Sequence, residues 1–275
     1  MKDILTEKGK AIILNAIGNP LLTNCYLSCR EIMDKISTHK IHCFCYEEGI
    51  VILIHPMDGL HKMYYFIKSQ DVLIPCLVRK IQKDIESYQN LEGTVVTRMP
   101  VKNVDILDKL EFHPYKKYIR KQMIPETTKQ YEAIHKAETA DMDDLNDIYQ
   151  LLYGTFDIMT DHLVSKAELR TLIEVCQVLK IAIDGELAGV LLFETFGKKS
   201  YLRSICVSDK FVGKKIGLSL LYTYILKNLE TTKLFYLWVE STNKRAIQLY
   251  EKLGYKDDGM QEYIYLYTNK YRINS

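Results

Sequence analysis

From Asp141 onward, hydrophobic residues follow a series of helix and strand patterns that strongly constrains the fold. Two amphipathic helices are predicted first, and two strand patterns then flank Asp184-Gly185-Glu186, a sequence typical of a tight hairpin. Strands and helices alternate after that. Two helices, a hairpin meander and then alternating strands and helices predict a mixed α/β sheet. The predicted ranges are 141–156 and 165–177 for the first helices, 178–184 and 187–196 for the hairpin, and 198–208, 216–230, 234–240, 243–255 and 262–269 for the rest.

Size and charge narrow the class of protein. The chain has 275 residues, 47% of them hydrophobic, which is enough for one large or two modest domains. A formal net charge of +2 indicates no broad field for nucleic acid or an anionic membrane, so neither is an expected partner. No apolar run approaches the roughly 18 residues of a membrane span, and the N-terminus lacks the pattern of a signal peptide. We therefore expect a cytoplasmic protein.

Seven cysteines, an odd number, fit free thiols in a reducing compartment. Cys25 and Cys29 are spaced for one helix face, and Cys43 and Cys45 for one strand face. No compact Cys-x-x-Cys or histidine set accompanies either pair. We predict buried free cysteines and no metal site.

The first half has its own mixture of helix and strand patterns, and the stretch 123–144 that follows it is polar and weakly periodic. We therefore predict an N-terminal α/β domain over 1–124, a linker over 125–136 and a C-terminal domain over 137–275. The elements predicted in the first half are helical structure over 1–40, with a periodic helix pattern from Leu22, then a hairpin over 41–56, a strand over 62–69, a helix over 70–88 with Pro75 in its early turn, and a strand over 91–100.

One loop has the composition of a phosphate site. The stretch 207–221, VSDKFVGKKIGLSLL, joins a strand end to a helix through two glycines and two lysines. The first N–H groups of a helix have no partner within the helix and attract anions, although glycine and lysine also occur in ordinary turns. Lys214 and Lys215 lie unfavourably near the positive end of the helix dipole, at a cost of about 0.3 to 1 kcal/mol that a bound phosphate would reverse. This favours the phosphate interpretation.

Four stretches in order carry a resemblance to a known family: the hairpin VLKIAIDGELAGVLLFE, the strand YLRSICV, the loop and helix FVGKKIGLSLLYTYIL, and LWVESTNKRAIQLYEKLGY. The chain from about residue 134 to 270 resembles the GNAT superfamily of acyl-CoA-dependent N-acyltransferases. In the last stretch Asn243, Ala246, Tyr250 and Leu253-Gly254-Tyr255 match the family's N…A…LYEKLGF motif. The resemblance implies a mixed, mostly antiparallel sheet flanked by helices.

The resemblance also implies a binding site for acetyl-CoA as cosubstrate. Val212 and Lys215 stand where the family has Arg or Gln and Gly, but the phosphate contacts are mostly backbone N–H groups, which these residues supply. An oxyanion donor is implied at the strand end near Val207. The implied cofactor-binding residues are Ile205, Cys206, Val207, Val212, Gly213, Lys214, Lys215, Ile216, Gly217, Leu218, Asn243, Ala246 and Tyr250.

The implied reaction is direct acetyl transfer to a primary amine in a ternary complex. Tyr250 is the expected acid that protonates the leaving thiolate, with a core aromatic as the alternative. Glu194 and Glu240 are the candidate bases, and solvated strand-end charges are the alternative for both.

A non-catalytic acyl-CoA-binding or regulatory module is the second hypothesis for the function of the chain. A nucleotide-binding protein is disfavoured because a Walker loop needs Gly-Lys-Ser/Thr where this loop has Gly-Lys-Lys. The amine acceptor is unidentified, and a monomer or a homodimer is expected.

The two halves align at an offset of 143 residues, which pairs Phe112 with Tyr255 and Leu110 with Leu253. The same offset puts Leu107 on Tyr250, so the first half has leucine where the second has its candidate acid. We predict that the first half is a degenerate copy of the same fold, a possible tandem GNAT, kept for packing or for shaping the substrate site. An unrelated small α/β domain is the alternative.

Overall fold

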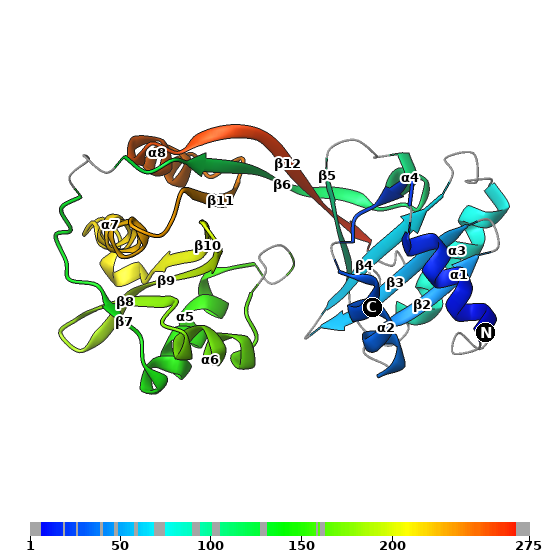
Figure 1. The fold of residues 1–275 in the computed structure, drawn as a ribbon, viewed down its shortest axis with the longest axis horizontal. Coiled ribbons are helices and arrows are strands. Elements are labelled where there is room, and N and C mark those ends of the chain that lie inside the picture. Colours follow the sequence, from blue (N-terminus) through cyan, green and yellow to red (C-terminus); the bar gives the residue numbers. More distant parts are fainter. Residues whose placement is uncertain are drawn as a thin grey trace, which may run out of the picture. The chain divides into compact units, whose positions relative to one another are not determined.

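The computed structural model describes residues 7–18, 20–25, 27–38, 41–46, 49–57, 60–68, 75–89, 94–100, 105–126, 131–157, 159 and 163–267. The chain forms two compact units: unit 1 comprises residues 1–117 and 261–275, and unit 2 comprises 118–260 (Figure 1). Two long strands, β6 (His113–Met123) and β12 (Lys256–Tyr267), each contribute residues to both units. The units therefore do not follow a single cut of the chain.

Unit 2 contains a seven-strand mixed sheet with the order β12-β6-β11-β10-β9-β8-β7. Strands β7 to β10 are antiparallel to one another, while β11 runs parallel to β10 and antiparallel to β6. The strands are β7 (Glu138–Thr139), β8 (Val178–Ile183), β9 (Glu186–Phe196), β10 (Lys199–Val207) and β11 (Leu234–Glu240). The helices are η2 (Met142–Asp144), α5 (Leu145–Thr155), α6 (Lys166–Glu174), η3 (Asp209–Phe211), α7 (Ile216–Asn228) and α8 (Lys244–Leu253). This confirms the predicted mixed, mostly antiparallel fold.

Each face of this sheet is covered by helices because its strands alternate buried side chains between the faces. On one face Leu220 of α7 and Leu253 of α8 pack in a cluster with Phe235 of β11. On the other face Ile148 of α5 and Leu169 of α6 pack with Val190 and other residues of β8 to β10. Helix α6 begins at a capping box in which Ser165 and Glu168 satisfy each other's backbone N–H groups, so its start is decided locally.

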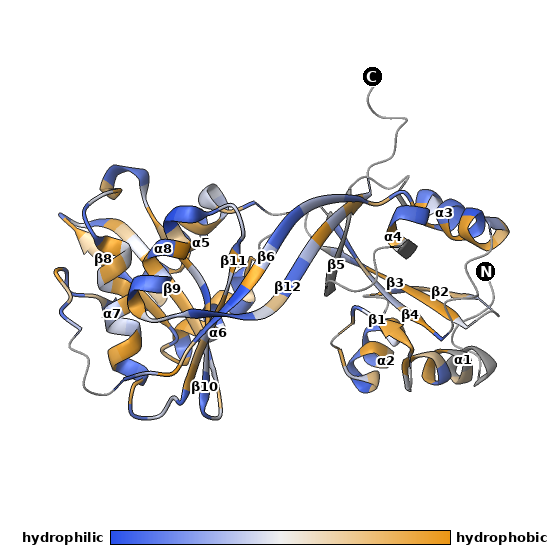
Figure 2. Cartoon of the chain, turned by 90° about the horizontal axis from the view of Figure 1, so that it is seen from above, coloured by the Kyte–Doolittle hydropathy of each residue, from blue (hydrophilic) through white to orange (hydrophobic). Residues whose placement is uncertain are grey.

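Unit 1 contains the strand order β2-β3-β4-β5-β12, with β1 beside β4. Strands β2 to β4 are antiparallel, and β5 runs parallel to β4. Strands β2 and β3 are strongly hydrophobic in Figure 2, in agreement with the full burial of Ile50, Ile52 and Ile54. The elements are α1 (Glu7–Gly18), β1 (Leu22–Thr23), α2 (Cys29–Ser37), β2 (His42–Tyr46), β3 (Ile50–Met57), β4 (Leu60–Ile67), α3 (Pro75–Gln89), β5 (Thr94–Pro100) and α4 (Asp105–Lys109). Among the helices within these ranges and those of unit 2, none is long and apolar enough to cross a bilayer.

The prediction of helix through the first forty residues is wrong between α1 and α2. Leu22 and Thr23 instead pair with β4, and α2 begins only at Cys29, after a capping box between Ser28 and Glu31. Cys25 thus precedes the helix and does not share a helix face with Cys29. All seven cysteines are free thiols, and the described residues contain no group of three or more potential metal ligands.

The two units repeat one order of elements. Three antiparallel strands lead to a helix, a parallel strand, a short helix and a long strand, as β2-β3-β4-α3-β5-α4-β6 and as β8-β9-β10-α7-β11-α8-β12. The offset of 143 residues holds at the ends of α4 and α8. The Phe112 N–H donates to the Leu107 carbonyl at 2.9 Å, and the Tyr255 N–H to the Tyr250 carbonyl at 3.0 Å. The similarity therefore extends to the local backbone.

Candidate functional site

Strands β10 and β11 separate at their C-terminal ends. They pair from Lys199 with Leu234 to Leu202 with Leu237, and β10 then continues to Val207 and β11 to Glu240 without further partners between them. A register shift between Leu202 and Ser204 marks the point of separation. Each strand remains paired on its other side, β10 with β9 and β11 with β6. The sheet of unit 2 is therefore open along one edge of β10.

The backbone of Val207 points into this opening. The Ser208 N–H donates to the Ala188 carbonyl of the neighbouring strand at 3.0 Å. Because hydrogen-bonding direction alternates along an antiparallel strand, the N–H groups of Val207 and Ile205 point to the opposite edge, toward the missing β11 partner. Cys206 between them points its backbone to β9, and its side chain packs in the cluster of α5 and α6. The predicted oxyanion donor thus faces an unpaired edge.

The loop after β10 presents a row of backbone donors. Buried Phe211 anchors η3, and the chain turns through Val212, Gly213, Lys214 and Lys215 into α7. Among the described residues, no hydrogen bond is made by five N–H groups of this turn and of the first turn of α7, whereas the next N–H in the helix, that of Ser219, is bonded to the Lys215 carbonyl. The five groups belong to Gly213, Lys215, Ile216, Gly217 and Leu218. Adjacent unpaired donors at a helix N-terminus fit an anionic phosphate.

The side chains of the loop lie around these donors. The Ile216 side chain is buried, whereas that of Val212 is 48% exposed, and the Val212 N–H is already bonded to the Asp209 carbonyl at 3.3 Å. The Lys214 ammonium lies over the Phe211 ring, 5.0 Å from its centroid. A Cβ atom at Gly217 would lie 3.6 Å from Val207 Cγ2, so the start of α7 rests closely on the end of β10.

Lys215 adopts a left-handed backbone conformation, with φ of 59°, as the N-cap of α7. A side chain in this region costs about 1 to 2 kcal/mol, whereas glycine adopts it freely. Lys215 thus holds a backbone conformation that glycine would adopt without strain.

Replacing Lys215 by glycine is expected to stabilise the protein by about 0.5 to 1 kcal/mol, the relieved strain less the added flexibility of the unfolded chain. Urea unfolding of Lys215→Gly measures the gain. Lys214→Gly is the matched control, since Lys214 does not have positive φ, and it should lose a similar amount. Equal destabilisation of both variants would contradict the strain at Lys215.

Asn243 is the N-cap of α8, since its side chain accepts from the Ala246 N–H at 3.1 Å. Further along the helix, Tyr250 is 6% exposed, and its ring meets that of Tyr255 edge-on, with 5.8 Å between centroids. Burial raises the pKa of Tyr250 above its usual value, so the phenol stays protonated at neutral pH. The side chain is therefore a proton donor in the state that an acid requires.

A buried lysine that the sequence did not single out supports α8. Lys121 of β6 is 3% exposed, and its ammonium lies 2.9 Å from the carboxylate of Glu251, the residue after Tyr250. A buried ammonium is costly unless it is paired, so this contact ties α8 to the sheet. It was not predicted because the two residues lie 130 positions apart.

The two candidate bases have different surroundings. Glu194 of β9 accepts from the Arg203 guanidinium at 3.0 Å, and the same guanidinium lies 3.8 Å from Glu168. Arg203 thus pairs with two neighbouring carboxylates. Glu240, at the end of β11, accepts from the Thr242 hydroxyl at 2.6 Å. The carboxylate of Glu194 is thus held by an opposite charge.

Half-buried aromatic residues lie on the sheet face opposite α7. The rings of Tyr201 and Tyr236 stack at 5.1 Å, and the Arg120 guanidinium lies 5.9 Å from the Tyr236 ring and 6.0 Å from that of Trp238. Arg120 also pairs with Asp258, whose side chain is 5% exposed. This group depends on the register of β6, β10 and β11, so the sequence offered no signal for it.

The buried tyrosines of unit 2 predict a loss of stability at alkaline pH. Burial raises the pKa values of Tyr224, Tyr250 and Tyr255 above the unfolded value of about 10. Because each phenol has a higher pKa in the folded than in the unfolded chain, its burial contributes fully to the free energy of unfolding below a pH of about 10. That contribution is lost as the pH rises further. We expect the free energy of unfolding to fall steadily above pH 10, measured by urea unfolding alongside tyrosinate absorbance. A constant value beyond that pH would contradict burial of these phenols.

The chain is similar to known proteins in sequence and in fold. Residues 142–255 match the model of a family described as Acetyltransferase (GNAT) family. No curated protein matches the chain. The matched range begins at η2 and ends at Tyr255, and so includes the opening, the loop and α8.

Solved structures share the fold at low sequence identity. A GCN5-related N-acetyltransferase from Sphaerobacter thermophilus is 14% identical, with a TM-score of 0.63 over 94% of this chain and 89% of its own. Another from Anabaena variabilis is 11% identical, with a TM-score of 0.62 over 95% and 70%. A tandem GNAT protein from the clavulanic acid biosynthesis pathway is 11% identical, with a TM-score of 0.56 over 94% of each chain. The likeness extends over both units.

Proposed function

We propose that this protein transfers an acetyl group from acetyl-CoA to a primary amine by direct attack in a ternary complex, because residues 142–255 match the model of the GNAT acetyltransferase family. The observation that carries the proposal is the open edge of β10, where the Val207 N–H lacks a strand partner and is followed by the unpaired donors of the loop. A thioester carbonyl at the former and a pyrophosphate at the latter would satisfy both sets of donors.

The residues around the opening have distinct roles in this proposal. The Val207 N–H donates to the oxyanion that forms as the amine nitrogen bonds to the thioester carbon. Tyr250 gives its proton to the thiolate as the carbon–sulfur bond breaks. Glu240 takes the proton that the amine loses, directly or through water, and exchange with solvent restores both side chains. Glu194 is the weaker candidate base because Arg203 already neutralises its charge.

Direct transfer is supported by the state of the cysteine nearest the opening. Burial raises the pKa of Cys206 to about 12, so its thiol stays protonated at neutral pH. The thiolate is the nucleophilic form of cysteine. Cys206 is therefore unsuited to carry the acetyl group as an enzyme thioester, which favours attack by the amine itself.

For the N-terminal half we propose a degenerate copy of the GNAT fold that contributes packing or shapes the acceptor site. Its support is the repeated order of elements together with Leu107, fully buried at the position equivalent to Tyr250. Leucine has no proton to donate, so acid catalysis by this half is not expected. The stretch equivalent to the phosphate loop is 68–75, KSQDVLIP, of which residues 69–74 lie outside the described residues. We also propose the domain bounds predicted from the sequence, 1–124 and 137–275, with the linker between them. A cytoplasmic location is a further proposal, which the free thiols favour.

Isothermal titration with acetyl-CoA, CoA and ATP tests binding, and thiol release across a panel of amines tests turnover. The proposal expects the two CoA compounds to bind, ATP not to bind, and at least one amine to release thiol. Binding without turnover on any amine would favour the non-catalytic acyl-CoA module. Binding of ATP alone would favour the nucleotide-binding hypothesis and overturn both others.

A further inference from the structure

A histidine from the predicted linker contacts both the phosphate loop and the helix that follows it. The His135 Nε2 atom lies 2.9 Å from the Lys214 carbonyl oxygen, and the His135 backbone N–H donates to the Ser219 hydroxyl at 3.2 Å. A carbonyl oxygen only accepts, so Nε2 carries the hydrogen in this contact. Ser219 is buried in α7, and its N–H donates the first hydrogen bond of that helix to the Lys215 carbonyl at 3.0 Å. His135 is therefore bonded on both sides of the turn.

The contact with Lys214 determines the direction of a donor. In a trans peptide the C=O and N–H groups point in opposite directions, and no cis peptide occurs among the described residues. The Lys214 carbonyl points to the His135 ring, so the N–H of the same peptide, which belongs to Lys215, points away from it. That N–H is one of the five unpaired donors of the loop.

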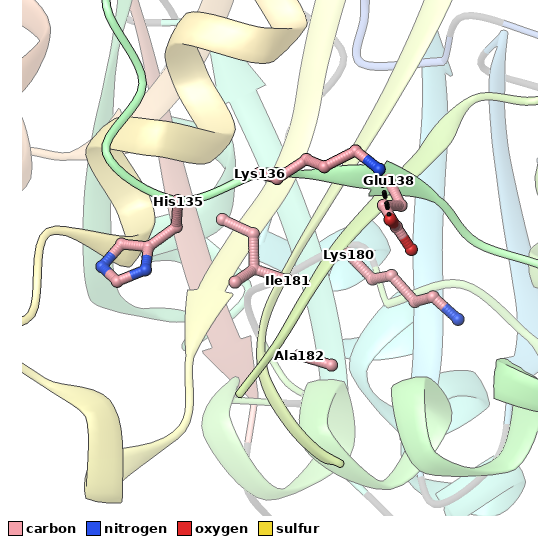
Figure 3. Close-up of a pocket in the computed structure, with 6 residues that line it drawn as sticks. All are labelled: His135, Lys136, Glu138, Lys180, Ile181 and Ala182. Carbon is pink, nitrogen blue, oxygen red and sulfur yellow. Dashed lines mark hydrogen bonds and ion pairs between the residues drawn. The ribbon is translucent and has the colours of Figure 1, made fainter. Parts of the chain in front are cut away.

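The same peptide precedes the strained residue. Lys215 holds φ of 59°, and such a conformation persists only where its surroundings enforce it. Figure 3 shows the His135 ring pointing away from the Lys136–Glu138 ion pair, beside a pocket also lined by Lys180, Ile181 and Ala182. Because a pocket lies beside the ring, packing alone does not fix it, and the bond to Lys214 supplies the constraint.

We propose that His135 is a positioning residue for the pyrophosphate of acyl-CoA: its Nε2–H holds the peptide between Lys214 and Lys215 so that the Lys215 N–H points to the phosphate oxygens. The inference rests on the proposed function of the loop. The histidine does not contact the ligand and acts through the backbone. Its bond to Lys214 holds the backbone conformation that Lys215 adopts at a position where the related family has glycine.

The test uses CoA as the probe in isothermal titration with the full chain. His135→Ala should weaken CoA binding about tenfold, whereas His135→Gln, whose amide N–H can reach the same carbonyl, should stay within about twofold of wild type. Lys136→Ala is the matched control, because Lys136 lines the same pocket and pairs with Glu138 instead of the loop, and it should bind as wild type does. Thermal melts of all variants show that each is folded.

Ionic strength separates positioning from charge. The contact is a hydrogen bond to a neutral carbonyl, so the loss of CoA affinity in His135→Ala should be the same at low and high salt. If His135 instead attracted the phosphate by its charge, the loss of affinity would become smaller as the salt concentration rises. Three results would each overturn the inference. They are equal weakening of CoA binding in His135→Ala and His135→Gln, equal weakening in Lys136→Ala, and a loss of affinity that disappears at high salt. If wild type binds CoA and His135→Ala binds equally well, this inference alone fails. If wild type binds no acyl-CoA, the proposed function fails and this inference with it.

Discussion

Tyr250→Phe lowers the rate of acetyl transfer by about 100-fold, the lower end of what a positioned general acid contributes. The substitution removes only the hydroxyl, which makes no hydrogen bond among the described residues, and keeps the ring that packs on Tyr255. Folding and the affinity for acetyl-CoA should therefore be unchanged. Thiol release with an accepted amine measures the rate, and thermal melting and isothermal titration measure the other two.

Tyr255→Phe is the control for this prediction. The Tyr255 hydroxyl is buried, has no hydrogen-bond partner among the described residues and belongs to the adjacent ring. It differs from Tyr250 in lying beyond the end of α8, outside the proposed acid position. The control should keep the wild-type rate. A full rate in Tyr250→Phe, or an equal loss in both variants, would assign Tyr250 to the core and remove the acid from the mechanism.

Gly189→Ala destabilises the protein by about 2 kcal/mol, because it overpacks the contact between β9 and the start of α7. A Cβ atom at Gly189 would lie 2.8 Å from Ile216 Cγ2 and 3.0 Å from the Cys206 carbonyl oxygen. Neither atom is at the free end of a flexible side chain, so α7 must move from the sheet. The unpaired donors at its N-terminus move with it, and acetyl-CoA binding should weaken as well.

Gly154→Ala is the matched control, since a Cβ atom there meets nothing within 4 Å and the residue lies inside α5. Alanine in an open helical position should stabilise the protein by up to about 1 kcal/mol. Urea unfolding of both variants measures the difference. Wild-type stability in Gly189→Ala would mean that α7 is not pressed against β9 as the structure has it.

Several features of the fold and of the site were predictable because they are formed by residues close in the chain. The Asn243 cap reaches only to Ala246, and Pro75 begins α3 because its missing N–H is not needed there. The hairpin at Asp184 and Gly185 follows from two residues that take positive φ. In each case the stabilising contact spans a few residues, so the sequence pattern contains both partners.

Other features were missed because their partners are distant in the chain. His135 was assigned to a linker, yet it bonds to Lys214 at a separation of 79 residues. The burial and pairing of Lys121 leave no local pattern in the sequence, because its partner Glu251 is 130 residues away. The helix predicted from Leu22 failed for a related reason, since Leu22 and Thr23 pair with β4 more than forty residues later.

Local patterns in the chain are thus sufficient to identify the strand, loop and capped helix that resemble an acyl-CoA site. Hydrogen bonding over three or four residues and hydrophobic periodicity involve only residues that are close together in the sequence. They do not contain the separation of β10 from β11 or the sharing of β6 and β12 between the two units. They also leave undefined the direction of the Lys215 N–H. Those depend on strand register and on contacts between distant segments, whose free energy exists only once the sheet has formed.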